Sequence, residues 1–406
     1  MKSLRPHVST GWKATRCLLQ PPTPAIQPAT GRQSTESLRR LHHRSKSSTA
    51  AAPQTSASLS FANPVAPQPQ RRALPGRCIS CRSGVRCTNP VATKSLRAPQ
   101  SQASYSTKAA PSEEPTVHGL FETKTGTWQY VVADPSTLTA VIIDPVLDYD
   151  PTTLAVTTQS PDALLSLVKE KGYTIDRILE THAHADHLTA SAYLQKRLTQ
   201  EQGYKPLIGI GKRIEQVQEL FGRKYGILPE EYGGVFDKLF EDDECFSIGE
   251  LKATAIHLPG HTPDHLGYKI GDNVFCGDSL FHADIGTARC DFPGGSASNL
   301  FNSGRRLLRF PDHVKIWTGH DYPPDDRSAM PWMTVREHKE QNKHLKDGIT
   351  EEEFVALRKE RDATLAEPRL VHQSLQMNIR AGRLPRPSEG GHRLLHVPLK
   401  QKDVEW

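Results

Sequence analysis

One short segment carries four potential metal ligands, His182, His184, Asp186 and His187. It follows an apolar run at residues 175–180 that is typical of a strand, and it precedes residues 188–198, where apolar side chains recur at helical spacing. We therefore expect His182 and His184 to point the same way from a turn, and Asp186 and His187 to open the helix. Imidazole and carboxylate together suit zinc, iron or manganese, so the segment predicts a metal site without naming the metal.

Three later segments supply ligands of the same kinds. His261 follows a Pro-Gly turn, and Asp278 and His320 each follow a glycine at the end of an apolar run. Each of these residues, taken alone, is equally well explained as an ordinary structural residue. In this order and at these separations, the three residues and the His-rich segment together predict one metal centre.

Strand-like and helix-like runs alternate around these ligands. Strands are expected at residues 118–122, 128–133, 138–143, 175–180, 251–257, 265–270, 274–275 and, as the last strand, 314–317. Helices are expected from an N-cap at Ser160 to Gly172, at 188–198, 300–309 and 334–346, and after Thr350, which forms a capping box with Glu353. We expect one α/β domain at residues 116–385, because no repeat or Gly/Ser linker interrupts it, and a tail at 386–406.

The order of these motifs resembles the metallo-β-lactamase superfamily, in which an HxHxDH segment precedes a His, an Asp and a final His. Asp144, within Ile142–Pro145, matches the first motif of that family, an acid that supports the metal ligands without binding the metal itself. The resemblance covers residues 116–385. It implies an αββα sandwich with the metal centre at one edge.

Two branches of this superfamily retain every ligand position of this chain. The glyoxalase II branch hydrolyses thioesters of glutathione with two metal ions, such as two zinc ions, held by His182, His184, Asp186, His187, His261, Asp278 and His320. The persulfide dioxygenase (sulfur dioxygenase) branch holds one Fe(II) per chain with three of them. Counting ligands therefore does not choose between the branches.

Other segments resemble the persulfide dioxygenase branch. Its further motifs are matched by Gly286–Phe292 with Arg289 and Asp291, by Asn378 and Arg380, and by Gly319–Tyr322. The basic residues of the glutathione-binding domain of glyoxalase II have no evident counterpart near the C-terminus. Residues 203–243 look like an insertion relative to the shorter dioxygenases, which affects the expected substrate preference.

The resemblance implies that His182, His261 and Asp278 bind the iron. Two imidazoles and one carboxylate on one face leave three coordination positions for substrate and O₂ together. The implied reaction oxidises glutathione persulfide with O₂ to sulfite and glutathione, in hydrogen sulfide catabolism. On this interpretation the other ligand-type residues form a vacated second site or support the first, and these are His184, Asp186, His187 and His320.

Arg289 is predicted to anchor an anionic substrate, because a guanidinium can pair with a carboxylate through two hydrogen bonds. The alternative is a structural pair with Asp291. The remaining substrate or structural candidates are Tyr322, Asn378 and Arg380, with a structural role favoured for the last two. His257 and His265 flank His261 and are expected at ordinary strand or surface positions.

Residues 1–110 differ in composition from the rest of the chain. They contain 17 Lys and Arg and a single acid, Glu36, for a net charge of +16, and they are rich in Ser and Pro. Arg-rich, Ser-rich and acid-poor sequence is typical of a mitochondrial transit peptide, so we expect import into the matrix. The alternative is a disordered basic tail that binds nucleic acid or a membrane surface.

The remaining 296 residues carry 34 bases and 44 acids, a net charge of −10. An acidic domain without a basic stripe is poorly suited to nucleic acid, so no nucleic-acid partner is expected, and no apolar run is long enough to span a membrane. The expected partners are glutathione persulfide and O₂, and the resemblance adds a homodimer. A metal-bearing binding or sensor protein without turnover is a third interpretation, which the intact ligand positions disfavour.

Overall fold

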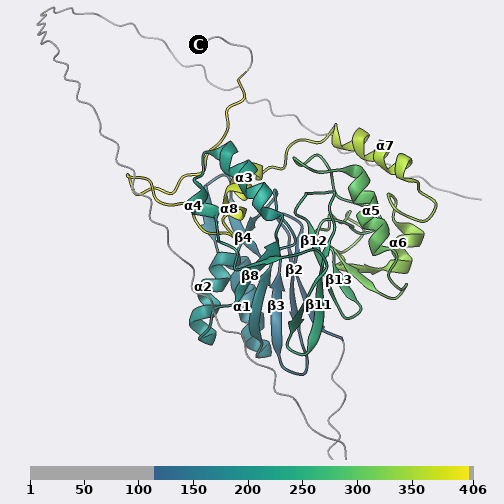
Figure 1. Cartoon of the computed structure of the whole chain (residues 1–406), viewed down its shortest axis with the longest axis horizontal. Coiled ribbons are helices and arrows are strands. Elements are labelled where there is room, and N and C mark those ends of the chain that lie inside the picture. Colours follow the sequence, from purple (N-terminus) through teal and green to yellow (C-terminus); the bar gives the residue numbers. More distant parts are fainter. Residues whose placement is uncertain (1–113, 402–406) are drawn as a thin grey trace, which may run out of the picture. The chain divides into compact units, whose positions relative to one another are not determined.

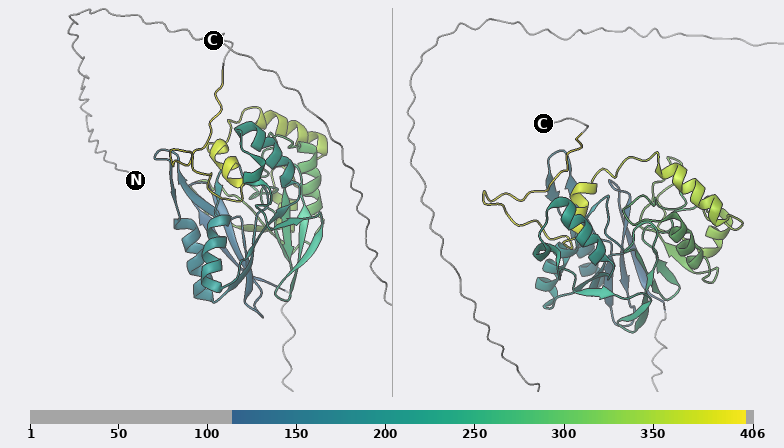
Figure 2. Two further views of the ribbon diagram at one scale, coloured as in Figure 1. Left: turned by 60° about the vertical axis from the view of Figure 1, so that its left-hand side comes forward. Right: turned by 45° about the horizontal axis from the view of Figure 1, so that its top comes forward.

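The computed structural model describes residues 114–401, so the predicted leader at residues 1–110 lies outside the described part. The described residues all belong to one compact unit. Two six-stranded sheets face each other at its centre, and helices cover both outer faces (Figures 1 and 2). This arrangement is the αββα sandwich that the sequence predicts.

The first sheet has the strand order β1-β2-β3-β6-β8-β9. Its strands are β1 (Thr116–Glu122), β2 (Thr127–Ala133), β3 (Thr139–Ile143), β6 (Thr174–Leu179), β8 (Leu207–Gly211) and β9 (Lys238–Phe240). The first three pair antiparallel, and β3, β6, β8 and β9 pair parallel. The β6 strand therefore lies in the middle of the sheet, where it delivers the His-rich segment.

The second sheet has the order β10-β11-β12-β13-β14-β15. Its strands are β10 (Glu244–Ile248), β11 (Leu251–His257), β12 (Leu266–Ile270), β13 (Asn273–Phe275), β14 (Lys315–Trp317) and β15 (Trp332–Thr334). A small third sheet consists of β5 (Ala155–Thr157), β4 (Val146–Asp150) and β7 (Leu188–Thr189). Because β13 and β14 are parallel neighbours, the residues that follow them meet at one edge.

Eight helices complete the described part of the chain, residues 114–401. They are α1 (Gln159–Lys171), α2 (Ser191–Gln202), α3 (Ile214–Tyr225), α4 (Pro229–Tyr232), α5 (Ala297–Leu307), α6 (Val335–Gln341), α7 (Glu351–Asp362) and α8 (Val371–Asn378). Side chains of α1, α2, α3 and α8 pack on the first sheet, and those of α5, α6 and α7 pack on the second. Figure 1 shows these two groups of helices on opposite sides of the sheets.

Strand β2 is buried on both faces, which explains its almost continuous apolar sequence. Val131 and Ala133 pack in the core between the first sheet and the helices, whereas Tyr130 and Val132 pack between the two sheets. Successive side chains of a strand point to opposite faces, so a strand that is covered on both faces is expected to be apolar at most positions.

Several predicted element boundaries are wrong. Helix α1 begins at Gln159, and Ser160 donates hydrogen bonds to Asp148 instead of capping the helix. Asp186 and His187 do not open a helix, because Leu188–Thr189 forms β7 and α2 begins only at Ser191. The strand at residues 315–317 is not the last, since β15 follows it.

The insertion-like stretch at residues 203–243 is part of the core. It contains β8, α3, α4 and β9, and Ile208 and Ile210 of β8 are buried against the helices. The helix predicted at 334–346 ends at Gln341, although a capping box begins it at Thr334. The capping box predicted at Thr350 and Glu353 is confirmed.

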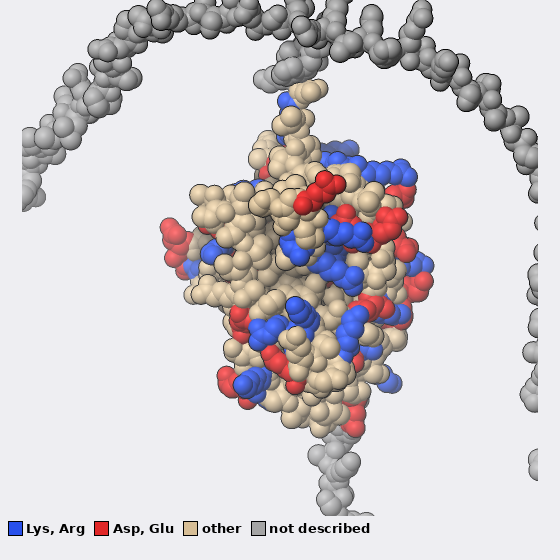
Figure 3. Space-filling view, turned by 90° about the vertical axis from the view of Figure 1, so that its left-hand side faces the viewer, with Lys and Arg blue, Asp and Glu red and all other residues tan. Residues whose placement is uncertain are grey.

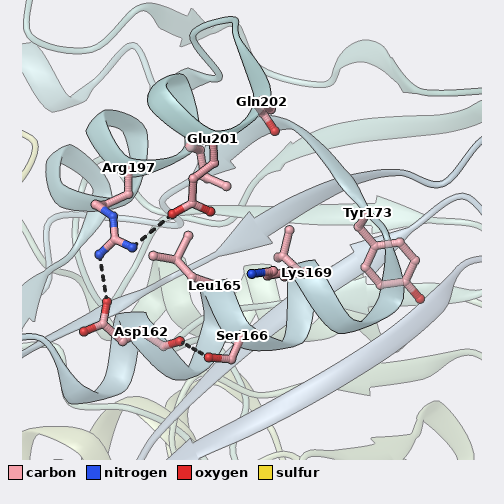
Figure 4. A pocket seen from close by; sticks show the side chains of 10 residues that line it. Asp162, Leu165, Ser166, Lys169, Tyr173, Arg197, Glu201 and Gln202 are labelled. Atoms are coloured by element: carbon pink, nitrogen blue, oxygen red, sulfur yellow. Dashed lines mark hydrogen bonds and ion pairs between the residues drawn. The ribbon is translucent and has the colours of Figure 1, made fainter.

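A cavity of about 740 Å³ lies between α1 and α2 (Figure 4). The guanidinium of Arg197 in α2 reaches Asp162 in α1 (3.3 Å) and Glu201 one turn along α2 (3.0 Å), and Lys169 and Tyr173 also line the cavity. None of its lining residues is a predicted metal ligand, so this cavity is separate from the predicted chemistry.

The charged surface of the described residues is mixed. Figure 3 shows Lys and Arg side chains interspersed with Asp and Glu over one face. Among residues 114–401, the structure contains no helix that is long and apolar enough to cross a membrane.

Gly260 should be intolerant of any side chain. Its φ is +144°, and a Cβ atom there would lie 2.3 Å from the backbone nitrogen of Leu300. We predict that Gly260→Ala lowers the free energy of unfolding by at least about 2 kcal/mol, through backbone strain and steric overlap. The matched control is Gly226→Ala, because Gly226 also has a positive φ but has open space around it. Urea unfolding that gives equal losses for both variants would contradict the prediction.

Candidate metal centre

The predicted ligands follow strand ends that lie close together in both sheets. The His-rich segment follows β6, His261 follows β11, Asp278 follows β13 and His320 follows β14. Backbone hydrogen bonds join these segments: the N–H of Leu266 donates to Thr181 O (2.7 Å), and the N–H of Gly319 donates to Gly277 O (2.9 Å). The fold therefore brings together residues that are more than 130 positions apart in the sequence.

His182, His261 and Asp278 form one group of buried ligand atoms. The Oδ2 atom of Asp278 lies 3.9 Å from His182 Nε2 and 3.7 Å from His261 Nε2. These separations allow one ion to contact all three atoms, since metal–nitrogen and metal–oxygen bonds are each about 2.0–2.2 Å long. The sequence predicted these three residues as one ligand set.

His184, Asp186, His187 and His320 form a second group. His320 Nε2 lies 3.1 Å from Asp186 Oδ2, and it also lies 3.7 Å from Asp278 Oδ2. The carboxylate of Asp278 therefore lies between the two groups and is within reach of both. All seven predicted ligand residues converge, so their side chains are able to hold one or two metal ions.

Several ligand atoms in this cluster are buried without a hydrogen-bond partner. They include His182 Nε2, His187 Nε2, both ring nitrogens of His320, and Asp278 Oδ1. Buried polar atoms normally have partners, because an unsatisfied one costs about 1–3 kcal/mol. Imidazole and carboxylate atoms that face one another in this way fit a bound cation, although these donors do not identify the metal.

Hydrogen bonds fix the tautomer of the histidines in the three-residue group. His261 Nδ1 donates to the carbonyl oxygen of Arg289 (2.7 Å), which leaves Nε2 with a free lone pair. Thr181 Oγ1 donates to Asp144 Oδ2 (2.8 Å) and accepts from His182 Nδ1 (3.0 Å), so His182 Nε2 is also free. Such contacts at the far ring nitrogen orient histidines that bind metals.

Burial keeps two of the histidines neutral. Desolvation, assisted by the positive potential of neighbouring histidines, holds the pKa of His182 well below its usual value. Burial likewise lowers the pKa of His187 to about 3. Neutral imidazoles have the lone pair that a metal requires, so both side chains are in the ligand form at neutral pH.

Asp144 organises the turn that carries the first two histidines. Its backbone has a φ of +48°, which is uncommon outside glycine, and its Oδ1 accepts the N–H of Thr181 (2.7 Å). The same oxygen lies 3.1 Å from His184 Nε2, and Glu180 Oε2 lies 3.5 Å from that nitrogen. These carboxylates hold the Nε2 side of the His184 ring, whereas its Nδ1 is buried without a hydrogen-bond partner.

Asn378 lies against the other end of the His-rich segment. Its Nδ2 donates to the carbonyl oxygens of His184 and His187 (2.8 Å each), and its Oδ1 accepts the N–H of Thr189 (2.8 Å). Arg380, by contrast, donates to Glu231 (2.9 Å) and to Gln376 O (2.7 Å), away from the ligands. The structure thus places Asn378 at the cluster as a support and leaves Arg380 outside it.

The guanidinium of Arg289 forms an ion pair with Asp291. It donates two hydrogen bonds of 2.5 Å to Asp291 and one of 2.8 Å to Ala366 O. This is the structural pair that the sequence offered as the alternative to substrate anchoring. The backbone carbonyl oxygen of Arg289 accepts the hydrogen bond that orients His261. Arg289 therefore supports the metal centre through its backbone.

Asp264 and His265 were missed as contributors to the site. Both are fully buried, and Asp264 Oδ2 accepts the N–H of Ala183 (2.9 Å), inside the His-rich segment. His265 Nε2 accepts the N–H of Asp278 (3.0 Å), and its ring stacks on that of His182. Burial holds the pKa of His265 well below its usual value, so the ring is neutral and can accept. The only sequence signal for a role of Asp264 and His265 in the site was their position close to His261.

A cavity of about 500 Å³ adjoins the ligands. Asp186, His261 and Asp278 lie on its wall, and so does Tyr322, whose ring stacks on that of His320.

The buried thiols nearby are unsuited to act as nucleophiles, because burial raises the pKa values of Cys276 and Cys290 to about 12.

We predict that His265→Leu weakens metal binding at least tenfold, because the buried N–H of Asp278 loses its acceptor. His265→Gln retains a side-chain acceptor and should restore most of the affinity, which a merely space-filling role would not explain. The measurement is metal retained per chain against a competing chelator. His257→Leu is the control, since His257 contacts no ligand residue. Equal retention by the Leu and Gln variants of His265 would contradict the prediction.

Comparisons with known proteins agree with this geometry. Residues 123–320 match the family model described as "Metallo-beta-lactamase superfamily". A "Beta-lactamase hydrolase-like protein" of Xylella fastidiosa is 42% identical over 71% of this chain, and the chain spans 65% of that protein. "Glyoxylase B2" of Dictyostelium discoideum is 42% identical over 68% of this chain and 94% of its own length.

A second set of similarities involves persulfide dioxygenases. "Persulfide dioxygenase ETHE1, mitochondrial" of Bos taurus is 28% identical over 66% of this chain and 89% of its own length. The crystal structure of ETHE1 from Myxococcus xanthus superposes with a TM-score of 0.53 at 27% identity, covering 66% of this chain and all of that one. The shared domain, the strand-end ligands and these relatives together lead to one conclusion: the chain belongs to the metallo-β-lactamase superfamily.

Proposed function

We propose that this metallo-β-lactamase superfamily enzyme is an iron-dependent persulfide dioxygenase. Its substrates would be glutathione persulfide, O₂ and one water molecule, and its products sulfite, glutathione and two protons. The proposal is supported by the similarity to proteins named persulfide dioxygenase and by the motifs around Arg289, Asn378 and Tyr322. We also propose that residues 1–110, outside the described part, direct the protein to the mitochondrial matrix.

The observation that carries the proposal is the convergence of His182, His261 and Asp278 as one buried ligand set. The Nε2 atoms of the two histidines lie 3.9 and 3.7 Å from Asp278 Oδ2, and their other ring nitrogens are held by Thr181 and by the Arg289 carbonyl. Two imidazoles and one carboxylate form a complete ligand set for one Fe(II) ion. A binuclear centre would also need His184, whose Nε2 contacts Asp144 and whose Nδ1 is buried without a hydrogen-bond partner.

A bound Fe(II) would supply open coordination positions at which persulfide sulfur and O₂ can both bind. The residues of the chain orient the metal ligands and shape the cavity. Thr181 and the Arg289 carbonyl hold His182 and His261 in the required tautomer. Phe281 and Ile285 line the cavity beside Asp278 and provide an apolar wall next to the reacting sulfur. Holding both reactants in one place makes their reaction effectively intramolecular.

A hydrolase of the glyoxalase II type, with two metal ions, is the second candidate. The convergence of His184, Asp186, His187 and His320 within bonding range of one ion favours it. The names of the 42%-identical relatives, which refer to a hydrolase and to a glyoxylase, point the same way. Both candidates use a glutathione derivative and the same cavity, so they differ mainly in the metal centre.

Turnover distinguishes the two candidates. The full chain, prepared without oxygen under reducing conditions, is expected to contain about one iron and to consume O₂ with matched formation of sulfite from glutathione persulfide. An oxygen electrode and sulfite quantification provide the measurement, and lactoyl-glutathione is offered in parallel. Two zinc ions per chain with thioester cleavage and no oxygen uptake would refute the dioxygenase.

The ligand roles predict unequal effects of two histidine substitutions. His261→Ala should abolish iron retention, since it removes one of three ligands, whereas His320→Ala should leave the iron bound. Metal analysis of both purified variants, with circular dichroism to verify folding, is the measurement. Equal loss of metal from the two folded variants would argue for a shared binuclear centre.

A further inference from the structure

Five cationic side chains line the cavity next to the metal ligands, which is an unusual concentration of positive charge for an acidic domain. They are Lys124, Arg289, Arg358, Arg361 and Arg369. The only carboxylates on the same wall are Asp186 and Asp278, and both belong to the metal cluster. A metal ion bound there would offset these acids, so the charge of the remaining cavity depends on the five cations.

Two of the five cations are neutralised by carboxylates of the chain. Arg289 forms a bidentate pair with Asp291. Arg358, which is buried, pairs with Asp362 one helical turn along α7 and also donates to Thr287 O (3.3 Å). These two arginines are therefore part of the scaffold of the cavity wall.

The other three cations have no such partner. Within residues 114–401, the side chains of Lys124, Arg361 and Arg369 form no ion pair or hydrogen bond, and all three are exposed. They come from separate elements: Lys124 from the turn between β1 and β2, Arg361 from the last turn of α7, and Arg369 from the segment that precedes α8. Like charges that converge on one cavity repel each other, and a bound anion would relieve the repulsion.

We propose that Arg361 and Arg369, with Lys124, form an anion-binding subsite that holds the carboxylates of the substrate while its sulfur lies at His261 and Asp278. The inference rests on the proposed function and adds the residues that select the substrate. No basic residue near the C-terminus was expected to bind the substrate, because nothing local in the sequence shows that α7 and the segment after it reach the cavity.

The rest of the wall fits such a substrate. Phe281 and Ile285 lie on it, and so does Leu365, which is placed between Arg361 and Arg369 in the sequence. An apolar surface between the metal ligands and the cations suits a molecule whose sulfur and carboxylates are separated by an uncharged segment. Guanidinium–carboxylate pairs are short, charge-assisted and directional, so they position a substrate as well as attract it.

Two variants and one control test the subsite. Arg361→Gln and Arg369→Gln should each raise the KM for glutathione persulfide about tenfold and leave kcat within twofold, because binding before the chemical step is what they weaken. Arg309→Gln, at an exposed arginine just after α5 that does not line the cavity, should match the unsubstituted protein.

Calorimetry with S-methylglutathione on the metal-loaded full chain measures the same subsite without turnover. Each variant should bind it about tenfold more weakly than the unsubstituted protein. The diethyl ester of S-methylglutathione, whose carboxylates are blocked, should bind weakly and equally to all the proteins. Variants that bind the acid as tightly as the unsubstituted protein, or that weaken acid and ester equally, would overturn the proposal.

This design separates the subsite from the proposed function. If the protein consumes no O₂ but both variants lose affinity for S-methylglutathione, the dioxygenase fails and the subsite stands. If O₂ uptake yields sulfite but the variants bind and turn over normally, the subsite fails and the dioxygenase stands.

Discussion

The buried carboxylate of Asp278 is the group around which the metal centre is built. Its Oδ2 lies between 3.7 and 3.9 Å from the Nε2 atoms of His182, His261 and His320, and the side chain is 5% exposed. A buried carboxylate is costly unless a positive partner compensates it. Because hydrogen bonds at Nδ1 leave Nε2 of His182 and of His261 without a proton, a metal cation is the partner that the arrangement provides for.

The surrounding structure keeps this carboxylate and the histidines in place. His265 holds the backbone of Asp278, Asp264 and Asp144 hold the His-rich segment from inside, and Asn378 holds it from the C-terminal side. The ligands themselves follow the ends of β6, β11, β13 and β14, whose positions are set by the two facing sheets. The site is therefore rigid because strands and buried hydrogen bonds, rather than the ligands alone, determine its geometry.

The sequence predicted the elements whose signal is local. The seven ligand residues form recognisable motifs, β2 and β3 are short apolar runs, and Thr350 with Glu353 is a capping box that a few residues define. The sequence did not predict that residues 203–243 complete the first sheet, that His265 contacts Asp278, or that Arg361 and Arg369 reach the cavity. These features depend on packing between distant segments, as the contact of Asn378 with His184 shows across 194 positions.

We propose that His182, His261 and Asp278 bind one iron ion and that no second metal ion binds among His184, Asp186, His187 and His320. Anomalous diffraction at the iron absorption edge, from crystals of the iron-loaded protein, is the decisive measurement. We expect a single peak, surrounded by His182 Nε2, His261 Nε2 and Asp278. Two peaks of comparable height, with the second among Asp186, His187 and His320, would contradict it.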